Sequence, residues 1–198
     1  MKKVSMAELN RKIIHLGSVL IPISYLWYVK EQNKMILILI CLSMLSIAID
    51  YLRNKLNILN SFFNFFFTKM LRKSELDGKT TGATWLLLGS LLTVIFFPIY
   101  IAVPSLIYLT VGDSFAALVG KNFPYGRVGN KSITGTLTGI VFSSIVALKL
   151  NKVLPFELII LGSVVAMLIE LFPHHTLNDN LTIPVLSAFS IQIAFYFL

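Results

Sequence analysis

The chain has 198 residues, of which 56% are hydrophobic and only 13% are Asp, Glu, Lys or Arg. A soluble domain typically has about 25% charged residues, and the mean hydropathy of this chain is +0.80. This composition excludes an ordinary soluble domain and predicts an integral membrane protein. The single cysteine, Cys41, can form no intramolecular disulfide.

Seven segments are long and apolar enough to span a membrane, which takes about 20 mostly apolar residues. They are 12–30, 35–52, 81–98, 99–119, 133–150, 155–172 and 181–198. Because backbone polar groups in a bilayer need partners within the protein, we expect these segments to be helices. They use nearly the whole chain, so we expect an all-α, polytopic membrane protein with one domain covering residues 1–198.

The first of these segments has a signal peptide as its alternative, because basic residues precede an apolar stretch. Pro22, Tyr25, Trp27 and Tyr28 stand where the small residues of a cleavage site would be needed, which favours an uncleaved first span.

Between the second and third spans, Lys55–Leu71 is rich in Phe but interrupted by Asn and Lys. This pattern predicts an amphipathic helix lying in the cytoplasmic membrane interface. The alternative is an eighth, buried span, which would reverse the sidedness of everything after it.

The basic residues set the orientation of a seven-span chain. All but four of the 17 Lys and Arg residues fall on the side that holds the N-terminus, and the four exceptions are Lys30, Lys34, Lys149 and Lys152. The positive-inside rule therefore predicts a cytoplasmic N-terminus and an outside C-terminus. The lipid bilayer is the expected partner of these basic loops, rather than a nucleic acid. The oligomeric state stays open.

Polar residues gather on the same cytoplasmic side. They are His15, Asp50, Arg53, the segment 77–85, Asp113, the segment 129–136 and the segment 170–184. The outer connections contain few polar residues. Acids within spans are costly, and they usually line a cavity, pair with a base or bind an ion. A cytoplasmic functional site is therefore expected.

The residue types in this group suit phosphate chemistry. Asp113, Glu170 and Asp179 offer the hard oxygen ligands that Mg²⁺ or Ca²⁺ prefers. Basic side chains stand between residues 121 and 131, close to glycines and to the start of the fifth span, where a helix N-terminus attracts anions. Carboxylates, bases and glycines together are the equipment of phosphoryl transfer. The stretch GRVGNKS does not have Walker A spacing, and an ordinary basic loop remains its alternative.

Other residues have structural interpretations. Gly112, Ala116 and Gly120 form a row of small residues four apart, which is typical of helix packing in membranes. Asp50 and Arg53 are three apart and are expected to pair at a helix end.

The histidines are weak signals by themselves. His15 fits an interfacial hydrogen bond at least as well as a catalytic base. The adjacent His174 and His175, with no Cys or further His nearby, make a poor zinc site.

Four motifs in order resemble those of the CTP-dependent lipid-alcohol kinases, which include dolichol kinase, phytol kinase and CTP-dependent diacylglycerol kinase. The motifs are ELNRKIIHLG from residue 8, TTGATWLLLG from 80, VGDSFAALVGKNFPYGR with GNKSITGTLTG from 111 to 139, and IELFPHHTLNDNLTIPVLSA from 169. In the last motif, Asn178 stands where the family commonly has an acid, so Asp179 is the sole acid at that point.

The resemblance implies transfer of the γ-phosphate of CTP to the hydroxyl of a membrane lipid alcohol at the cytoplasmic face, with Mg²⁺ or another divalent cation such as Ca²⁺. It implies Asp113, His15 and Lys131 as catalytic residues, with His15 as base or as the group that orients the alcohol. The implied metal residues are Asp113, Asp179 and Glu170. The implied nucleotide and phosphate residues are Lys121, Arg127, Lys131, Ser132, Thr134, Gly135, Asn180 and Thr81.

The acceptor is left open by the sequence among phytol, geranylgeraniol, a long polyprenol and diacylglycerol, and the compact seven-span form favours a prenyl alcohol. Two other functions compete with the kinase. A CTP-dependent phosphatidate-type cytidylyltransferase would use the same nucleotide, although its longer signature is absent from the sequence. A small ion- or proton-coupled transporter would use the acids as an ion path, although it would spread them through the membrane depth.

Overall fold

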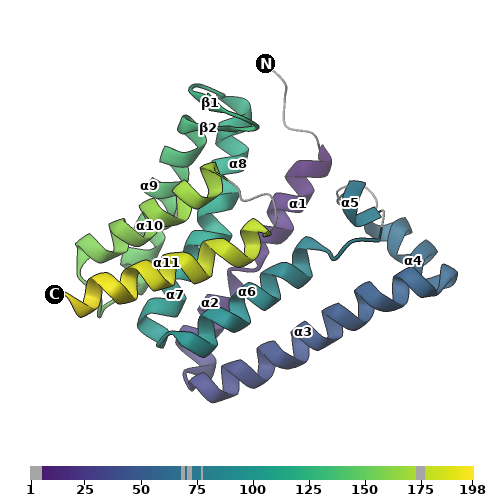
Figure 1. Cartoon of the computed structure of the whole chain (residues 1–198), viewed down its shortest axis with the longest axis horizontal. Coiled ribbons are helices and arrows are strands. Elements are labelled where there is room, and N and C mark those ends of the chain that lie inside the picture. The colour runs from purple at the N-terminus through teal and green to yellow at the C-terminus, as the bar shows by residue number, and fades with distance from the viewer. Residues whose placement is uncertain (1–5, 68–69, 71–72, 77, 173–176) are drawn as a thin grey trace.

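The computed structural model describes residues 6–67, 70, 73–76, 78–172 and 177–198, and these are almost wholly helical (Figure 1). The helices are α1 (Met6–Gly17), α2 (Leu20–Ser24), α3 (Gln32–Lys55), α4 (Asn57–Phe67), α5 (Lys73–Leu76), α6 (Gly82–Phe96), α7 (Ile99–Ile107), α8 (Asp113–Asn122), α9 (Ile133–Leu150), α10 (Phe156–Leu171) and α11 (Asp179–Tyr196). Two π-helical turns, η1 (Tyr25–Val29) and η2 (Tyr108–Gly112), join them. The predicted all-α class is confirmed.

Four helical runs in the described part of the chain are long and apolar enough to cross a membrane. They are Glu8–Val29, Gln32–Lys55, Ile99–Asn122 and Ile133–Leu150. Each coincides with a predicted span, and α6, α10 and α11 occupy the other three predicted ranges. These apolar helices support the expected membrane protein.

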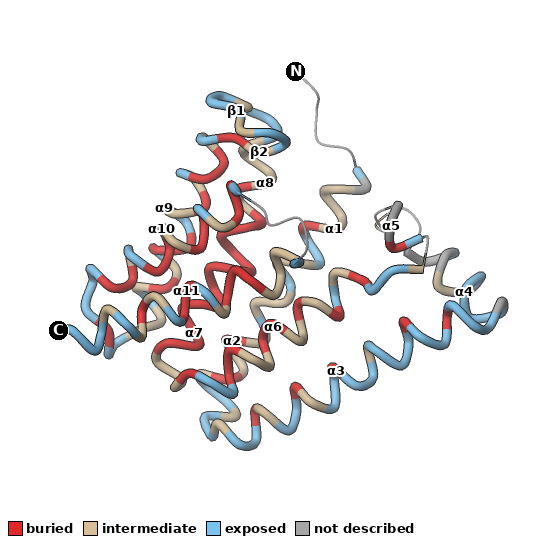
Figure 2. Tube along the Cα trace, viewed as in Figure 1, coloured by how far each residue is buried: buried red, intermediate tan, exposed pale blue. Residues whose placement is uncertain are grey.

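One continuous helix, formed by α7, η2 and α8, is the core of the molecule. Of the residues in its most apolar stretch, 83% are buried. Helices α9, α10 and α11 pack around it, together with α1 and α2 (Figure 2). Asp113 stands at the first position of α8, so the acid is held inside the most enclosed element of the fold.

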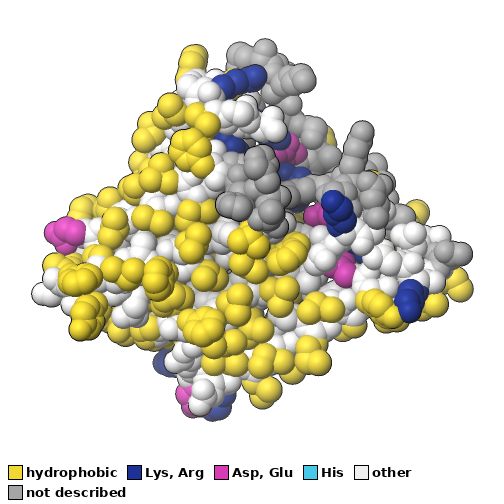
Figure 3. Space-filling view, in the orientation of Figure 1, with side chains coloured by type: hydrophobic (Ala, Val, Ile, Leu, Met, Phe, Trp, Pro, Cys, Tyr) yellow, Lys and Arg dark blue, Asp and Glu magenta, His cyan; other side chains and the backbone are white. Residues whose placement is uncertain are grey.

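The outer helix α3 has the opposite character. It packs on α6 and α4, while its apolar side chains Leu37, Met44 and Leu45 are 62%, 66% and 58% exposed. Apolar side chains also cover the middle of the face drawn in Figure 3, with charged ones around its margins. A surface this apolar is what a lipid-facing protein presents, because hydrocarbon is the solvent there.

The core helix departs from regular α geometry in two places. In each place, a backbone carbonyl of the core helix is contacted by a side chain from another part of the chain. Pro104 has no N–H to donate to the carbonyl of Tyr100 four residues earlier. The side-chain amide of Asn151 donates to that carbonyl instead, at 2.8 Å. In the π turn before Asp113, the carbonyl of Leu109 lies 3.1 Å from Nε2 of His15. Such turns are frequent at functional sites.

The segment predicted as a loop after α8 contains a short hairpin. Strand β1 (Arg127–Val128) pairs antiparallel with β2 (Lys131–Ser132). Gly129 turns the chain with a φ of +58°, a conformation that type II′ hairpin turns reserve for glycine at this position. The sequence reasoning missed these strands because each has only two residues. The hairpin fixes the direction in which Lys131 leaves the backbone.

The predicted amphipathic segment Lys55–Leu71 contains helix α4. Thr68, Lys69 and Leu71 in that segment, Asp77 of the predicted polar segment 77–85, and the pair His174 and His175 lie outside the described residues.

Candidate functional site

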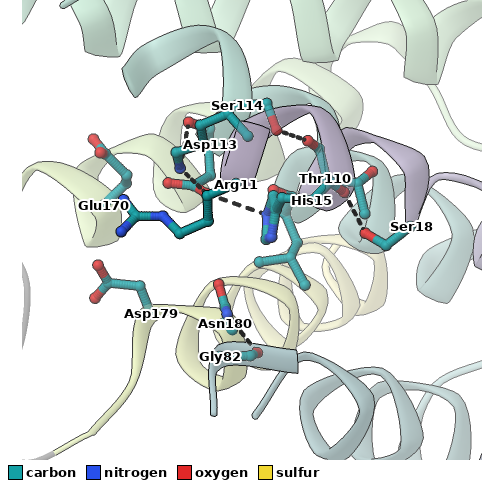
Figure 4. A network of polar contacts seen from close by, with 12 residues as sticks. Arg11, His15, Ser18, Gly82, Thr110, Asp113, Ser114, Glu170, Asp179 and Asn180 are labelled. Carbon is teal, nitrogen blue, oxygen red and sulfur yellow. Dashed lines mark hydrogen bonds and ion pairs between the residues drawn. The ribbon is translucent and has the colours of Figure 1, made fainter. Parts of the chain in front are cut away.

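Asp113 is the centre of a polar network that joins α1 to the core helix (Figure 4). Its side chain is almost fully buried, and its Oδ2 accepts a hydrogen bond from Nζ of Lys12 at 2.6 Å. The same ammonium donates to the backbone carbonyl of Asp113 at 3.3 Å. Nε2 of His15 lies 3.2 Å from the same Oδ2. A carboxylate buried this deeply needs such partners, because an isolated buried charge is costly.

The surroundings of His15 assign its tautomer. Its Nε2 faces two acceptors, the carbonyl of Leu109 at 3.1 Å and the carboxylate of Asp113 at 3.2 Å. A ring nitrogen between two acceptors carries the proton. In a neutral imidazole, Nδ1 is therefore the nitrogen with the free electron pair.

A second ion-pair group connects the hairpin to α10 and α11. Nζ of Lys131 forms a close ion pair with Oε1 of Glu170 and lies 3.8 Å from Oδ2 of Asp179. Burial by itself would lower the pKa of Lys131, but the carboxylates of Glu170, Asp113 and Asp179 outweigh burial and raise the pKa above its ordinary value of 10.5. The ammonium therefore stays charged at physiological pH.

A third group lies at the free end of α1. Oε1 of Glu8 pairs with Nη2 of Arg11 at 3.3 Å, and Oε2 of Glu8 pairs closely with Nζ of Lys121 at the end of α8. These contacts attach the first helix to the core helix next to the hairpin.

These groups surround a polar cavity of about 700 Å³. Its charged lining residues are four acids and four bases, and they belong to the ion pairs just described: Glu8, Arg11, Lys12, Asp113, Lys121, Lys131, Glu170 and Asp179. Gly129, Asn130 and Ser132 of the hairpin region complete one wall. The cavity can therefore offer bases to an anion and carboxylates to a cation at the same time.

A second cavity, of about 460 Å³, lies on the other side of Asp113. Most of its wall surface is apolar, and the helices α1, α2, α3 and α6 supply it together with Phe63 and Met70. The two cavities share four residues, which are Arg11, Lys12, Asp113 and Asn180. Asp113 thus stands in the wall between a polar and an apolar compartment.

The structure brings together most of the residues that the sequence predicts for the site. The polar cavity is lined by Asp113, Lys121, Lys131, Ser132, Glu170, Asp179 and Asn180. His15 lines only the apolar cavity.

Four of the expected nucleotide residues lie elsewhere. Arg127, Thr134 and Gly135 line neither cavity, and Thr81 lines the apolar one. The hydroxyl of Thr134 donates to the carbonyl of Phe123.

Gly135 and Thr81 have structural roles that the local sequence did not reveal. The N–H of Gly135 donates to Oγ of Ser132, which caps α9. Thr81 caps α6, and its hydroxyl donates to Oδ2 of Asp50 at 3.1 Å. Partners for both residues are therefore supplied within the fold.

Two structural predictions from the sequence are confirmed. Asp50 and Arg53 form an ion pair at 3.3 Å. The small residues of the core helix are contact points for α9, since a Cβ on Gly135 would meet the carbonyl of Ala116 and come within 3.0 Å of Cα of Gly120.

The carboxylates do not form a ready metal cluster, because no group of three or more His, Cys, Asp or Glu is gathered among the described residues. Glu170 and Asp179 instead face the polar cavity from two adjacent helices, with Lys131 between them. Mg²⁺ that arrives with a nucleotide commonly takes only one or two carboxylates, with phosphates and waters as its other ligands. The donor set fits an ion of that kind.

Lys12 is the site residue that sequence reasoning missed, because it was given no role beyond a topological charge and a place in the first of the four motifs. A signal was present, because Glu8, Lys12 and His15 are spaced four and three apart and share one face of a helix. Its partner Asp113 is 101 residues away, and the sequence contains no sign of that pairing.

The fold and site define an all-α protein with helices long and apolar enough to cross a membrane, and with paired polar and apolar cavities. The chain is 30% identical over 198 residues to the uncharacterized protein RP860 of Rickettsia prowazekii (strain Madrid E), with 96% of each chain covered. It belongs to the same family as that protein. No family model and no solved structure matches the chain.

Proposed function

We propose that this protein is a CTP-dependent lipid-alcohol kinase, which transfers the γ-phosphate of CTP to the hydroxyl of a membrane alcohol. The observation that carries the proposal is the position of Asp113 in the wall between a polar cavity and an apolar cavity. A phosphoryl donor is soluble in water and a lipid acceptor is soluble in hydrocarbon. An enzyme that joins them needs two such compartments that meet at one catalytic group.

In the membrane, the proposed arrangement has seven spans with the N-terminus in the cytoplasm and the C-terminus outside. Helix α4 then lies in the cytoplasmic interface, as its Phe-rich sequence predicts. The ends of α1, α8, α10 and α11 that line the polar cavity face the cytosol in this topology. The cavity therefore opens to the compartment that contains nucleotides.

The triphosphate is bound by the bases that now pair with carboxylates inside the polar cavity. Lys121 and Lys131 exchange Glu8 and Glu170 for phosphate oxygens, and Ser132 supplies a hydroxyl at the start of α9. Charge-assisted contacts to phosphate are strong and short. The raised pKa of Lys131 keeps its ammonium protonated for this contact.

Glu170 and Asp179, the two carboxylates beside Lys131, would hold the divalent cation of the nucleotide, with Asp113 as the third carboxylate of the site. The ion would supply positive charge that neutralises the phosphates.

In the transfer step, the oxygen of the alcohol forms a bond to the γ-phosphorus while the bond from that phosphorus to the β-bridging oxygen breaks. The products are a lipid monophosphate and CDP. Asp113 orients the hydroxyl and accepts its proton, while Lys12 and His15 hold the carboxylate in place. Because phosphoryl transfer has a loose transition state, positioning and charge neutralisation contribute more than base strength.

The test is a phosphotransfer assay on purified protein in detergent with Mg²⁺. CTP or ATP labelled on the γ-phosphate is offered with phytol, geranylgeraniol, undecaprenol, dolichol and diacylglycerol in turn. We expect a labelled lipid and CDP from CTP. Release of pyrophosphate when phosphatidate replaces the alcohol would identify a cytidylyltransferase instead, and folded protein that labels none of the lipids would contradict the proposal.

The Asp113→Asn variant is the matched test of the site, and we expect it to fold and to have no measurable turnover. Glu31→Gln removes a carboxylate that is exposed and pairs with Lys34 at 2.9 Å, and it should retain full activity. An active Asp113→Asn enzyme would contradict the role assigned to this carboxylate.

A further inference from the structure

The apolar cavity has walls that suit a hydrocarbon chain. Apolar side chains line it from α1, α2, α3 and α6, among them Ile14, Ile21, Ile49, Leu86 and Leu87. Its volume of about 460 Å³ falls within the range of pockets that enclose a small molecule. Ile14 and Ile21 are seven residues apart on α1 and α2, so the walls extend for about 10 Å along the helices.

This cavity opens sideways, toward the region where lipid would lie. Ile14 on α1 and Ile49 on α3 both line it, yet they are 55% and 44% exposed. Helix α1 packs on α8 and η2, whereas α3 packs on α6 and α4. The opening therefore lies between α1 and α3.

The hydroxyl groups in this cavity are already used within the protein. The Thr81 hydroxyl donates to Asp50 at 3.1 Å, and the Ser18 hydroxyl donates to the carbonyl of His15 at 2.5 Å. Thr84 donates to Asp50 at 2.8 Å, so Ser46, which lies 2.5 Å from Thr84, donates to Thr84. Among the described residues, the three hydroxyls that line the cavity, those of Ser18, Ser46 and Thr81, thus offer no proton to a ligand.

We propose that this cavity takes the chain of an ester-free long-chain alcohol, which enters from the bilayer between α1 and α3, and that it rejects glycerolipids with ester carbonyls. The proposal rests on the kinase function for the position of the reacting hydroxyl. An ester carbonyl drawn into the cavity would lose its water and find no hydroxyl donor. The bases Arg11 and Lys12 lie at the end shared with the polar cavity, where Glu8 and Asp113 hold them.

We infer that Phe63 of α4 determines how the hydrocarbon chain of the alcohol packs in the apolar cavity. It lines the apolar cavity, and its ring lies 4.9 Å from the guanidinium carbon of Arg53, which is buried beside Asp50. This contact attaches α4 to the cavity wall. Phe65 on the same helix is 84% exposed and does not line the cavity, so Phe65→Ala is the matched control for Phe63→Ala.

The first experiment compares three acceptors in the kinase assay: geranylgeraniol, a dialkylglycerol and a diacylglycerol with chains of equal length. The two glycerolipids differ only in ester carbonyls. We expect kcat/KM to be lower for the diacylglycerol than for the dialkylglycerol by about tenfold or more. Phe63→Ala should change the ratio between geranylgeraniol and dialkylglycerol, while Phe65→Ala should leave it unchanged. Equal rates with the two glycerolipids would overturn the proposal, and equal ratios in the two variants would overturn the role of Phe63.

The second experiment needs no phosphoryl transfer. A geranylgeraniol that carries a diazirine on its chain is irradiated with the purified protein without nucleotide, and the labelled peptides are identified by mass spectrometry. We expect labelling of α1 and α6, with competition by dialkylglycerol and little by diacylglycerol. Labelling confined to other helices would overturn the cavity assignment. Labelling of α1 and α6 in a protein that transfers no phosphate would refute the kinase and leave the lipid site standing.

Discussion

The Lys12–Asp113 ion pair allows a quantitative test of the structure. Lys12→Met removes an ammonium that lies 2.6 Å from Oδ2 of Asp113, while the aliphatic stem is largely kept. The carboxylate is 8% exposed at its side chain, so the variant leaves a buried charge with His15 as its remaining close partner. Removing one member of a buried pair costs about 3–5 kcal/mol. Because His15 remains, we expect a loss of about 3 kcal/mol.

That loss of stability is measurable as a fall in the melting temperature. For a chain of this length, 1 kcal/mol corresponds to about 2–4 °C, so Lys12→Met should melt about 6–12 °C below the wild type. The double variant Lys12→Met with Asp113→Asn removes the uncompensated charge and should recover most of the loss. Arg11→Met is the control, because its pair with Glu8 is one-third exposed on the Arg11 side and such pairs contribute about 1 kcal/mol or less.

The assay is thermal unfolding in detergent, followed by intrinsic fluorescence, for the four proteins side by side. A Lys12→Met protein that melts with the wild type would refute the buried pair. A double variant that is no more stable than Lys12→Met would show that the uncompensated carboxylate is not the source of the loss.

Variants at three further positions test other parts of the structure by melting temperature or by rate. Lys131→Met should lower kcat by about tenfold or more and Lys131→Arg by less, because a phosphate contact needs the charge; equal activity in both would contradict that contact. The carboxylates raise the pKa of Lys131 above 10.5, so its stabilisation is complete at neutral pH and is lost only as pH rises through the raised value. The melting difference between wild type and Lys131→Met should therefore stay constant from about pH 6 to 9, and a decline within that range would contradict the assignment. Gly135→Val would press a side chain on the carbonyl of Ala116 and should cost about 1–3 kcal/mol, whereas an unchanged melting temperature would place α8 and α9 further apart. Thr81→Val removes the cap of α6 and a hydrogen bond to Asp50, and should cost about 1–2 kcal/mol; a protein as stable as the wild type would argue against the cap.

The positions of the helices could be read from the sequence because they depend on local composition. A run of apolar residues long enough to cross a bilayer has only one good way to satisfy its backbone, which is a helix. Every predicted range accordingly contains helix in the structure. The acid Asp113 could be singled out for a related reason, since a charge inside an apolar run needs a partner or a function.

The partners of the site residues could not be read in this way. Lys12 meets Asp113 across 101 residues, and Thr81 meets Asp50 across 31. Such pairs depend on which helix faces pack together. Because most of these helices are apolar on all sides, their hydropathy does not indicate which face contacts which neighbouring helix. The hairpin that directs Lys131 also escaped notice, because two-residue strands carry no periodicity.

The sequence by itself determined that the protein is helical and apolar, and that its acids, bases and glycines gather near one set of helix ends. Only the tertiary structure decided that Asp113 separates a polar cavity from an apolar one, and that Thr81 and Gly135 belong to the scaffold. The physical reason is that a cavity belongs to no single helix. It is the space left where α1, α3, α6 and the core helix fail to pack, and side chains distant in the chain line it together.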